Sequence, residues 1–352
     1  MAGRDRISQL PIEILDHIMG FLPIQQAAKI AVLSKVWRDA WSGLTRCCFD
    51  HHFFRYFENR LREEANECIE KPSCWNVIKK VILEHKGSIR KFVFLFSSFR
   101  KVNVRLQPCD LDESLLLVTQ RGVEEIRLSF GFNEYKLLDC VSSCSTLVRL
   151  YLQGFSIDPQ NATWTLPSAT SLSFDFVYFG TRNLSNYVFD VPKLEDLSFI
   201  NCKDIFLFDI TTRSLHNLTI NSCYSSKIGS FLPVNMDLKS ICTLAFDIDS
   251  LQDFLRKTTR KGLSIQLPTL TVEILKLSGF CFQDKAGVSA FVRLLCKCPK
   301  LRSLEIKFQT VVRTLYFIFR GKRFGQSFCC IHVHSIICSK YLIVGLFLLY
   351  IV

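Results

Sequence analysis

The residues of this chain that could do chemistry are its 16 cysteines and 7 histidines. A catalytic cysteine needs a partner histidine or another base, and the sequence offers no such constellation. The densest group in the chain comprises Cys329, Cys330, His332, His334 and Cys338. It lacks the two ligand pairs at recognised spacing that zinc sites of known type have. We therefore expect no catalytic residue, no metal site and no cofactor.

Other catalytic and nucleic-acid-binding classes are also disfavoured. The sequence contains no Gly-rich phosphate-binding loop and no G-x-S-x-G motif. The formal net charge is +12, but the basic residues are scattered, with no run of five or more. Nucleic-acid binding usually shows a basic run or stripe, so we expect no nucleic-acid partner. His51 and His52 lie among aromatic residues, and we interpret them as packing residues.

The first 45 or so residues carry the most specific pattern. Pro11 suits the first turn of a helix that ends near Gly20. A second helix is predicted over 25–33, and Ser34 is a good N-cap for a third. These elements place apolar residues at helical spacing. Three short helices bury little surface alone, so Trp37 and Trp41 either pack on the following domain or form a partner surface.

The segments LPIEILDHIMGFLP and AVLSKVWRDAW resemble an F-box of the plant type, over residues 4–45. The resemblance implies that the three helices dock on the Skp-type adaptor of a cullin ubiquitin ligase. Two positions depart from the family pattern, because Ile12 and Val36 replace charged residues. The residues implied to face the adaptor, or to hold that face together, are Leu10, Pro11, Ile14, Leu15, Ile18, Leu22, Pro23, Val32, Leu33, Ser34, Trp37 and Trp41.

The body of the chain is repetitive. Residues 46–87 read as a linker of two helices, and residues 88–310 contain a recurring apolar unit. Steps of 21 to 31 residues separate its equivalent positions, which are Leu128, Leu152, Phe174, Phe199, Ile220, Phe246, Leu277 and Ile306. This period predicts a leucine-rich-repeat solenoid with a curved parallel sheet. An antiparallel sandwich would repeat every eight to twelve residues. The expected fold class is thus α/β, with an N-terminal three-helix domain and an irregular repeat array.

Segments such as VEEIRL and CPKLRSLEI are similar to the plant family in which an F-box precedes a leucine-rich array. The resemblance implies a non-catalytic substrate receptor whose array binds an unknown protein target. The sequence leaves two alternatives open. One is a binding scaffold that recruits no ligase, and the other is a truncated product without function. A ligase with a catalytic cysteine is a further rival, for which the chain shows no motif.

The last segment, residues 311–352, has a different character. It is apolar, carries no Asp or Glu, and lacks the FBD pattern with which many members of that family continue. Its run from Tyr341 to Val352 is shorter than the roughly 20 residues of a membrane span. No signal-peptide pattern opens the chain. We therefore expect a cytoplasmic or nuclear protein without a membrane anchor, and we interpret the tail as an alternative or read-through end.

Overall fold

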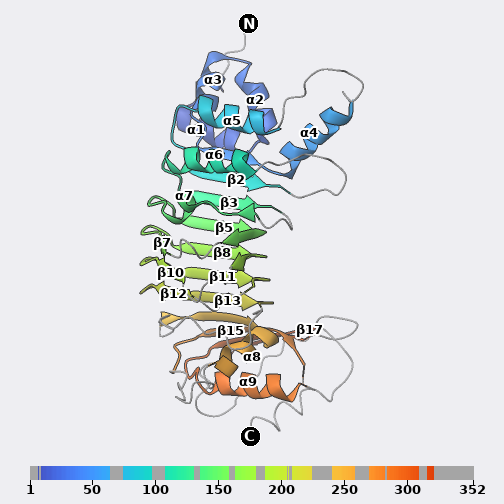
Figure 1. Cartoon of the computed structure of the whole chain (residues 1–352), viewed down its shortest axis with the longest axis vertical. Helices are drawn as coiled ribbons and strands as arrows, with labels where there is room; N and C mark the ends of the chain where they lie inside the picture. Colours follow the sequence, from blue (N-terminus) through green and yellow to red (C-terminus); the bar gives the residue numbers. More distant parts are fainter. Residues whose placement is uncertain are drawn as a thin grey trace. The chain divides into compact units, whose positions relative to one another are not determined.

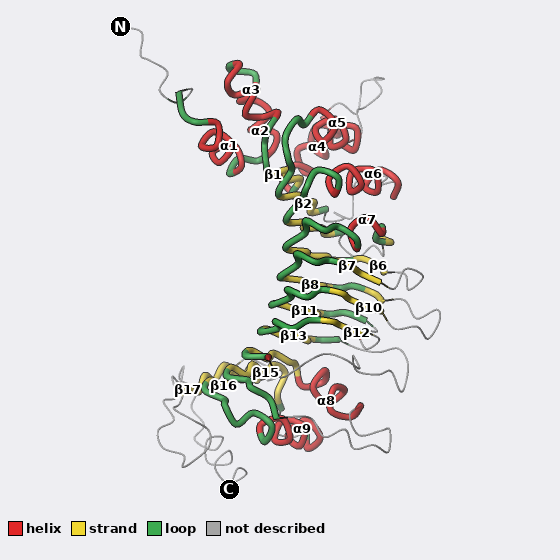
Figure 2. The backbone as a smooth tube through the Cα atoms, turned by 90° about the vertical axis from the view of Figure 1, so that its left-hand side faces the viewer, coloured by secondary structure: helices red, strands yellow, loops and turns green. Residues whose placement is uncertain are grey.

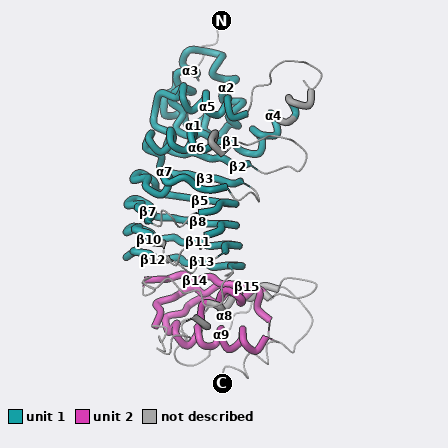
Figure 3. Tube along the Cα trace, in the orientation of Figure 1, with its two compact units in different colours: residues 1–237 teal, residues 238–352 magenta. Residues whose placement is uncertain are grey.

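The structure is a computed structural model. It describes residues 7, 9–63, 74–96, 108–130, 135–157, 163–179, 187–203, 205, 208–223, 240–257, 269–281, 284–308 and 315–320. The chain forms two compact units, Met1–Asp237 and Leu238–Val352 (Figure 3).

The first unit begins with the three predicted helices, α1 (Ile12–Gly20), α2 (Ile24–Ala31) and α3 (Lys35–Ser42). Ser34 caps α3 as predicted, and its Oγ accepts a hydrogen bond from the backbone N–H of Trp37 at 3.3 Å. Pro11 stands one residue earlier than expected. It occupies the N-cap of α1 with an extended backbone, φ −54° and ψ 148°, rather than the first turn. Pro23 does the same before α2.

The segment predicted as a helical linker contains its two helices, α4 (His51–Glu63) and α5 (Cys74–Glu84). It also contains a strand that was not predicted, β1 (Arg46–Phe49). β1 pairs in parallel with β2 (Lys91–Leu95), and Cys47 lies opposite Phe92. A strand of four residues has too few alternating positions to be recognised from its own pattern, and the partner strand defines it.

The main sheet of this unit is parallel, as the repeat period predicted. Beyond β2 it continues through β3 (Glu125–Ser129), β5 (Arg149–Gln153), β8 (Ser171–Asp175), β11 (Asp196–Ile200) and β13 (Asn217–Asn221) (Figure 1). The predicted equivalences are confirmed, because Leu128, Leu152, Phe174, Phe199 and Ile220 lie opposite one another along the ladder. Their side chains are all buried and form one continuous row in the core.

At the start of each strand, one backbone carbonyl accepts hydrogen bonds from two N–H groups at the start of the next strand. The carbonyl of Glu124, for example, accepts hydrogen bonds from the N–H groups of Val148 at 2.7 Å and Arg149 at 2.9 Å. The same two-donor arrangement recurs at the carbonyls of Thr45, Arg90, Val148, Thr170 and Glu195. The register of the array is therefore set from the residue that precedes β1 onward.

The strand ends also repeat. The residue that follows β5, β8, β11 and β13 adopts a positive φ, at Gly154 (77°), Phe176 (48°), Asn201 (51°) and Ser222 (53°). Glycine and asparagine tolerate this conformation best. After two of these turns a buried cysteine satisfies the backbone, since Cys202 donates to the carbonyl of Phe174 at 3.3 Å and Cys223 to that of Phe199 at 3.5 Å. The cysteines of LSFINC and LTINSC thus donate to carbonyls of the preceding strand of the main sheet.

The layer opposite the main sheet changes along the unit (Figure 2). It contains α5, α6 (Pro108–Thr119) and α7 (Asp139–Ser142), and then a sheet of short strands, β7 (Thr163–Thr165), β10 (Tyr187–Asp190) and β12 (Phe208–Thr211). Rings join the two sheets, because Trp164 of β7 lies 6.1 Å and Phe189 of β10 lies 6.4 Å from the ring of Phe174 on β8. A further row pairs β4 (Tyr135–Lys136), β6 (Phe155–Ile157) and β9 (Tyr178–Phe179).

The second unit contains the parallel strands β14 (Thr243–Asp247), β15 (Ile274–Phe280) and β16 (Ser303–Phe308), with helices α8 (Ile248–Lys257) and α9 (Lys285–Leu295). Here too the predicted positions align, with Leu277 opposite both Phe246 and Ile306. Within the segment predicted as an apolar tail, β17 (Leu315–Arg320) pairs antiparallel to β16. The run from Tyr341 to Val352 and the Cys329–Cys338 group lie outside the described residues.

Candidate interaction surfaces

The three N-terminal helices have a small core of their own. It consists of Leu15, Met19, Ala27, Ala40 and Leu44, all buried. Leu22, Trp37 and Trp41 pack against it and stay partly exposed. The two tryptophans therefore belong in part to this core, which supports the expectation that some of the predicted residues hold the surface together.

The opposite side of α1 presents apolar side chains to solvent. Ile14 and Ile18 are one turn apart and are 46% and 36% exposed, whereas Leu15 between them is fully buried. A helix places residues four apart on one face, so this face is a stripe. Further along the chain, Val32 and Leu33 are each 75% exposed.

The twelve predicted adaptor residues divide by exposure. Six are exposed, namely Leu10, Pro11, Ile14, Ile18, Val32 and Leu33. Five are half-buried, namely Leu22, Pro23, Ser34, Trp37 and Trp41, and Leu15 is buried. Four further exposed apolar residues were not included in the prediction, namely Ile7, Ile12, Phe21 and Val36. Ile12 and Val36 are the two positions that depart from the family pattern, and their apolar side chains enlarge the exposed apolar surface. The exposed predicted residues and these four further ones together form a surface that we call the helical apolar surface.

A cavity of about 460 Å³ lies between α3 and α5. Trp41 lines it together with Arg38, Val81 and Glu84. His85 also lines the cavity; its side chain is largely buried and its Nε2 contacts the carbonyl of Leu44 at 2.6 Å. Trp41 thus also borders the segment that follows the three helices. This agrees with the interpretation that it packs on the following domain.

The second surface is the outward face of the main sheet in the first unit. Every second residue of the main-sheet strands β1, β2, β3, β5, β8, β11 and β13 lies on this face, and the register aligns these residues in rows. One row contains Arg46, Lys91, Glu125, Arg149, Ser171, Asp196 and Asn217. The next contains Cys48, Val93, Arg127, Tyr151, Ser173, Ser198 and Thr219, of which Val93 is buried. We call this surface the outer sheet face.

Ion pairs join three neighbouring strands on this face. The Glu125 carboxylate lies 2.5 Å from Lys91 Nζ and 3.0 Å from a terminal guanidinium nitrogen of Arg149. Burial alone would raise the pKa of Glu125, but the hydrogen bonds and charges of Lys91 and Arg149 hold it below its ordinary value. Glu125 therefore stays ionised and neutralises part of the positive charge around it.

Hydrogen bonds join the strand ends in the same way. Ser129 donates to Gln153 at 2.7 Å, and Gln153 donates to the Asp175 carboxylate at 2.9 Å. Asn201 donates to the other oxygen of Asp175 at 3.2 Å. In the row that begins with Cys48, the guanidinium of Arg127 lies 4.9 Å from the centre of the Tyr151 ring. The outer sheet face is thus polar and ordered by its own contacts, which suits a binding surface.

The reactive side chains nearest these surfaces are not arranged for catalysis. Burial raises the pKa of Cys47 to about 12. Burial, with the charge of Asp50, raises that of Cys48 to about 11. Only the thiolate is nucleophilic, so both thiols are unreactive near neutral pH. This argues against a catalytic cysteine at either position.

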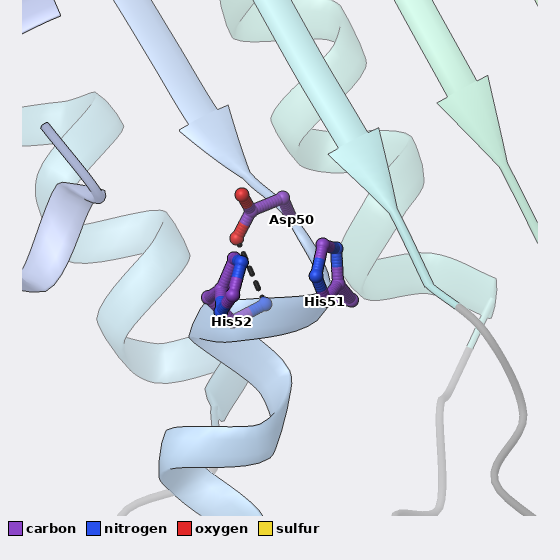
Figure 4. Close-up of side chains that lie close together, drawn as sticks. All are labelled: Asp50, His51 and His52. Carbon is purple, nitrogen blue, oxygen red and sulfur yellow. Dashed lines mark hydrogen bonds between the residues drawn. The ribbon is translucent and has the colours of Figure 1, made fainter. Parts of the chain in front are cut away.

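Asp50, His51 and His52 come together at the start of α4 (Figure 4). Their potential ligand atoms lie within 4.8 Å of one another. One Asp50 oxygen already accepts the backbone N–H groups of His52 at 2.9 Å and Phe53 at 3.2 Å, and so caps the helix. Because the Asp50 carboxylate already accepts two backbone N–H groups at the helix start, we interpret the arrangement as a helix cap.

Comparison with known proteins identifies both parts of the chain. The F-box domain profile matches residues 7–49. The profile described as the At1g61320/AtMIF1 LRR domain matches residues 81–314, about two thirds of the chain. The chain belongs to this F-box/LRR family. The resemblance noted from the sequence is therefore confirmed, as is the solenoid fold.

Relatives of this F-box/LRR chain occur in Arabidopsis thaliana. F-box/FBD/LRR-repeat protein At1g13570 is 25% identical over 86% of this chain and 76% of its own length. Putative F-box protein At3g58860 is 29% identical over 62% of this chain, and F-box protein At4g09920 is 27% identical over 61%. The chain spans 47% and 65% of the lengths of the latter two. No solved structure matches the chain. In the part of the chain that the structure describes, no helix has the length and apolar character needed to span a membrane.

Proposed function

We propose that this F-box/LRR chain is the substrate receptor of a Skp–cullin–F-box ubiquitin ligase. The three helices would dock on a Skp-type adaptor, which connects to a cullin, and the outer sheet face would hold a protein target. Such a receptor needs no catalytic residue, because it contributes proximity between the target and a ubiquitin-loaded enzyme. We propose the cytoplasm or nucleus as its location, where ubiquitin ligases of this type act.

The observation that carries this proposal is the helical apolar surface on a domain that matches the F-box profile. Ile14 and Ile18 are exposed although the same helix, α1, buries Leu15 and Met19, and Leu33 in the turn after α2 is exposed as well. Exposed apolar residues gathered on one small domain are typical of a partner surface. The polar outer sheet face on the same chain supplies a separate surface for a target.

Capture of a Skp-type adaptor by the full chain tests the proposal. We would compare the wild type with Ile14→Glu, and use Leu116→Glu as the matched control. Ile14 and Leu116 are both 46% exposed, but Leu116 lies on α6, outside the F-box. Ile14 is a sharper choice than Trp37, because Trp37 also packs on the helical core.

We expect Ile14→Glu to weaken adaptor binding by about thirtyfold or more, since truncating a central interface residue costs about 2 kcal/mol. Leu116→Glu should bind like the wild type. If the folded wild type does not capture the adaptor, the ligase role is wrong and the chain is a binding scaffold of another kind.

A further inference from the structure

The charges on the outer sheet face are distributed unevenly. The outward positions of β1, β2, β3 and β5 carry four cations, Arg46, Lys91, Arg127 and Arg149, against the single carboxylate of Glu125. The outward positions of β8, β11 and β13 carry Asp175 and Asp196 and no cation. This face is therefore positive near the F-box and negative further along the first unit.

Two of the cations have no carboxylate partner among the described residues. The guanidinium of Arg127 lies over Tyr151, and that of Arg46 lies 5.9 Å from the centre of the Phe21 ring. Packing against a ring holds a guanidinium in place while its N–H donors stay available. Since the single carboxylate of Glu125 offsets one of the four cations, a net charge of +3 remains on the outward positions of these four strands.

A cavity lies at the positive end of the face. It has a volume of about 300 Å³ and is formed by the α1–α2 turn together with β1 and β2. Phe21, Leu22, Pro23 and Val93 supply apolar wall, and Arg46 and Lys91 supply two positive charges. Asp50, whose carboxylate caps α4, supplies one negative charge, so the wall keeps a net positive charge. A cavity of this kind fits a side chain of a bound peptide that lies next to an acidic residue.

We propose that the target of this F-box/LRR chain presents an acidic segment, which lies across β1, β2, β3 and β5 with its apolar neighbour in the cavity beside Phe21. This inference rests on the proposed function, because it names the class of target that the outer sheet face takes. The four strands are separated by three spacings of about 4.8 Å, a distance that about four residues of an extended segment would span. The acidic stretch is therefore short.

A protein segment fits the charges better than a nucleic acid does. A nucleic-acid strand that continued along the array would bring its phosphates to Asp175 and Asp196. Guanidinium groups pair with carboxylates through two parallel hydrogen bonds, and Arg127 and Arg149 already point their charged ends to the same face. The acidic residues of β8 and β11 then fix the orientation of the segment, since they repel its acidic part.

An array of synthetic peptides tests this inference. The full chain would be applied to peptides that differ in their content of Asp and Glu, with Asn and Gln replacements as neutral counterparts. The variant Arg127→Gln/Arg149→Gln removes two cations from the face. The control Lys193→Gln/Lys300→Gln removes two exposed lysines from turns that precede β11 and β16.

We expect acidic peptides to be retained over their neutral counterparts, and retention to fall about tenfold or more in the Arg127/Arg149 variant but not in the control. Binding should also weaken as salt is raised. The inference is overturned if acidic peptides show no preference, or if a single-stranded oligonucleotide binds more tightly than they do and is lost in the same variant.

Adaptor capture by the same variant separates this inference from the proposed function. If the Arg127/Arg149 variant captures the adaptor normally and loses the acidic peptides, both proposals are supported. If the wild type captures the adaptor without selecting acidic peptides, only the target class is wrong. If it selects acidic peptides without capturing the adaptor, the ligase role fails while the acidic preference stands.

Discussion

Asp16 on α1 and Thr45 just before β1 are joined by two hydrogen bonds through one carboxylate. The backbone N–H of Thr45 donates to Asp16 Oδ1 at 2.8 Å, and its hydroxyl donates to Oδ2 at 2.7 Å. The Thr45 carbonyl in turn accepts the N–H groups of Arg90 and Lys91 at the start of β2. Thr45 thus connects α1 of the F-box to the start of β2, because its side chain and N–H bind Asp16 and its carbonyl accepts two N–H groups of the repeat array.

Asp16→Ala should lower the free energy of unfolding by about 2 kcal/mol, because it leaves Thr45 without a charged acceptor. Thr45→Val removes only the hydroxyl bond and should cost less. In a double-mutant cycle the two changes should couple by about 1 kcal/mol, measured by urea unfolding. If the two costs simply add, the carboxylate does not join these segments.

Gly287→Ala should destabilise the second unit, although alanine favours a helix over glycine by up to about 1 kcal/mol. A Cβ at Gly287 would lie 2.5 Å from Asp284 Oδ2 and 2.7 Å from Ile248 Cγ1. Asp284 also caps α9 through the N–H of Ala286, so the cap must shift. We expect a net loss of about 1 to 2 kcal/mol in thermal unfolding. Gly43→Ala is the control, because its Cβ would meet only the Asp39 carbonyl at 3.7 Å.

Stability should depend on the ionisation of Glu125. Its pKa is lower in the folded chain than in the unfolded chain, where it is about 4.3. The stabilisation is therefore present above that pH and is lost as the pH falls through the folded pKa. Glu125→Gln should reduce the acid sensitivity of unfolding. Glu84→Gln, at an exposed pair 3.8 Å from Lys80, should leave the acid profile unchanged, and equal profiles for all three proteins would contradict the prediction.

Cys47 and Cys48 should resist alkylation near neutral pH. Burial raises the pKa of both thiols, to about 12 and about 11, so almost no thiolate is present at pH 8. Among the cysteines that the structure describes, Cys296 is exposed and should react with iodoacetamide before Cys47 and Cys48. Mass spectrometry of the digested protein would show the order. Labelling of Cys47 or Cys48 at the rate of Cys296 would revive the hypothesis of a catalytic cysteine.

Local patterns in the sequence were enough to predict the helices and the repeat. Ser34 caps α3 because its hydroxyl reaches a backbone N–H three residues on, which is a contact within one turn. The equivalent residues Leu128, Leu152 and Phe174 align because each repeat must bury the same inward side chain to stack. Such patterns did not separate exposed from buried positions on α1, since buried Leu15 was predicted in one set with exposed Ile14 and Ile18.

The unpredicted features depend on contacts between distant residues. β1 exists because Arg46–Phe49 finds hydrogen-bond partners on β2, more than forty residues later. The polarity of the outer sheet face follows from register, which places Glu125 between Lys91 and Arg149.

The sequence by itself determined the three helices and the parallel stacking of the repeats, because both rest on short-range periodicity and on burial within one unit. The family followed from the resemblance of its motifs to those of F-box and leucine-rich-repeat proteins. Only the tertiary structure decided which apolar residues of the F-box remain exposed, where Asp16 meets Thr45, and how the charges gather on one face. These depend on which segments pack together, and the physical reason is that hydrogen bonds and ion pairs form between groups that are close in space, whatever their separation along the chain.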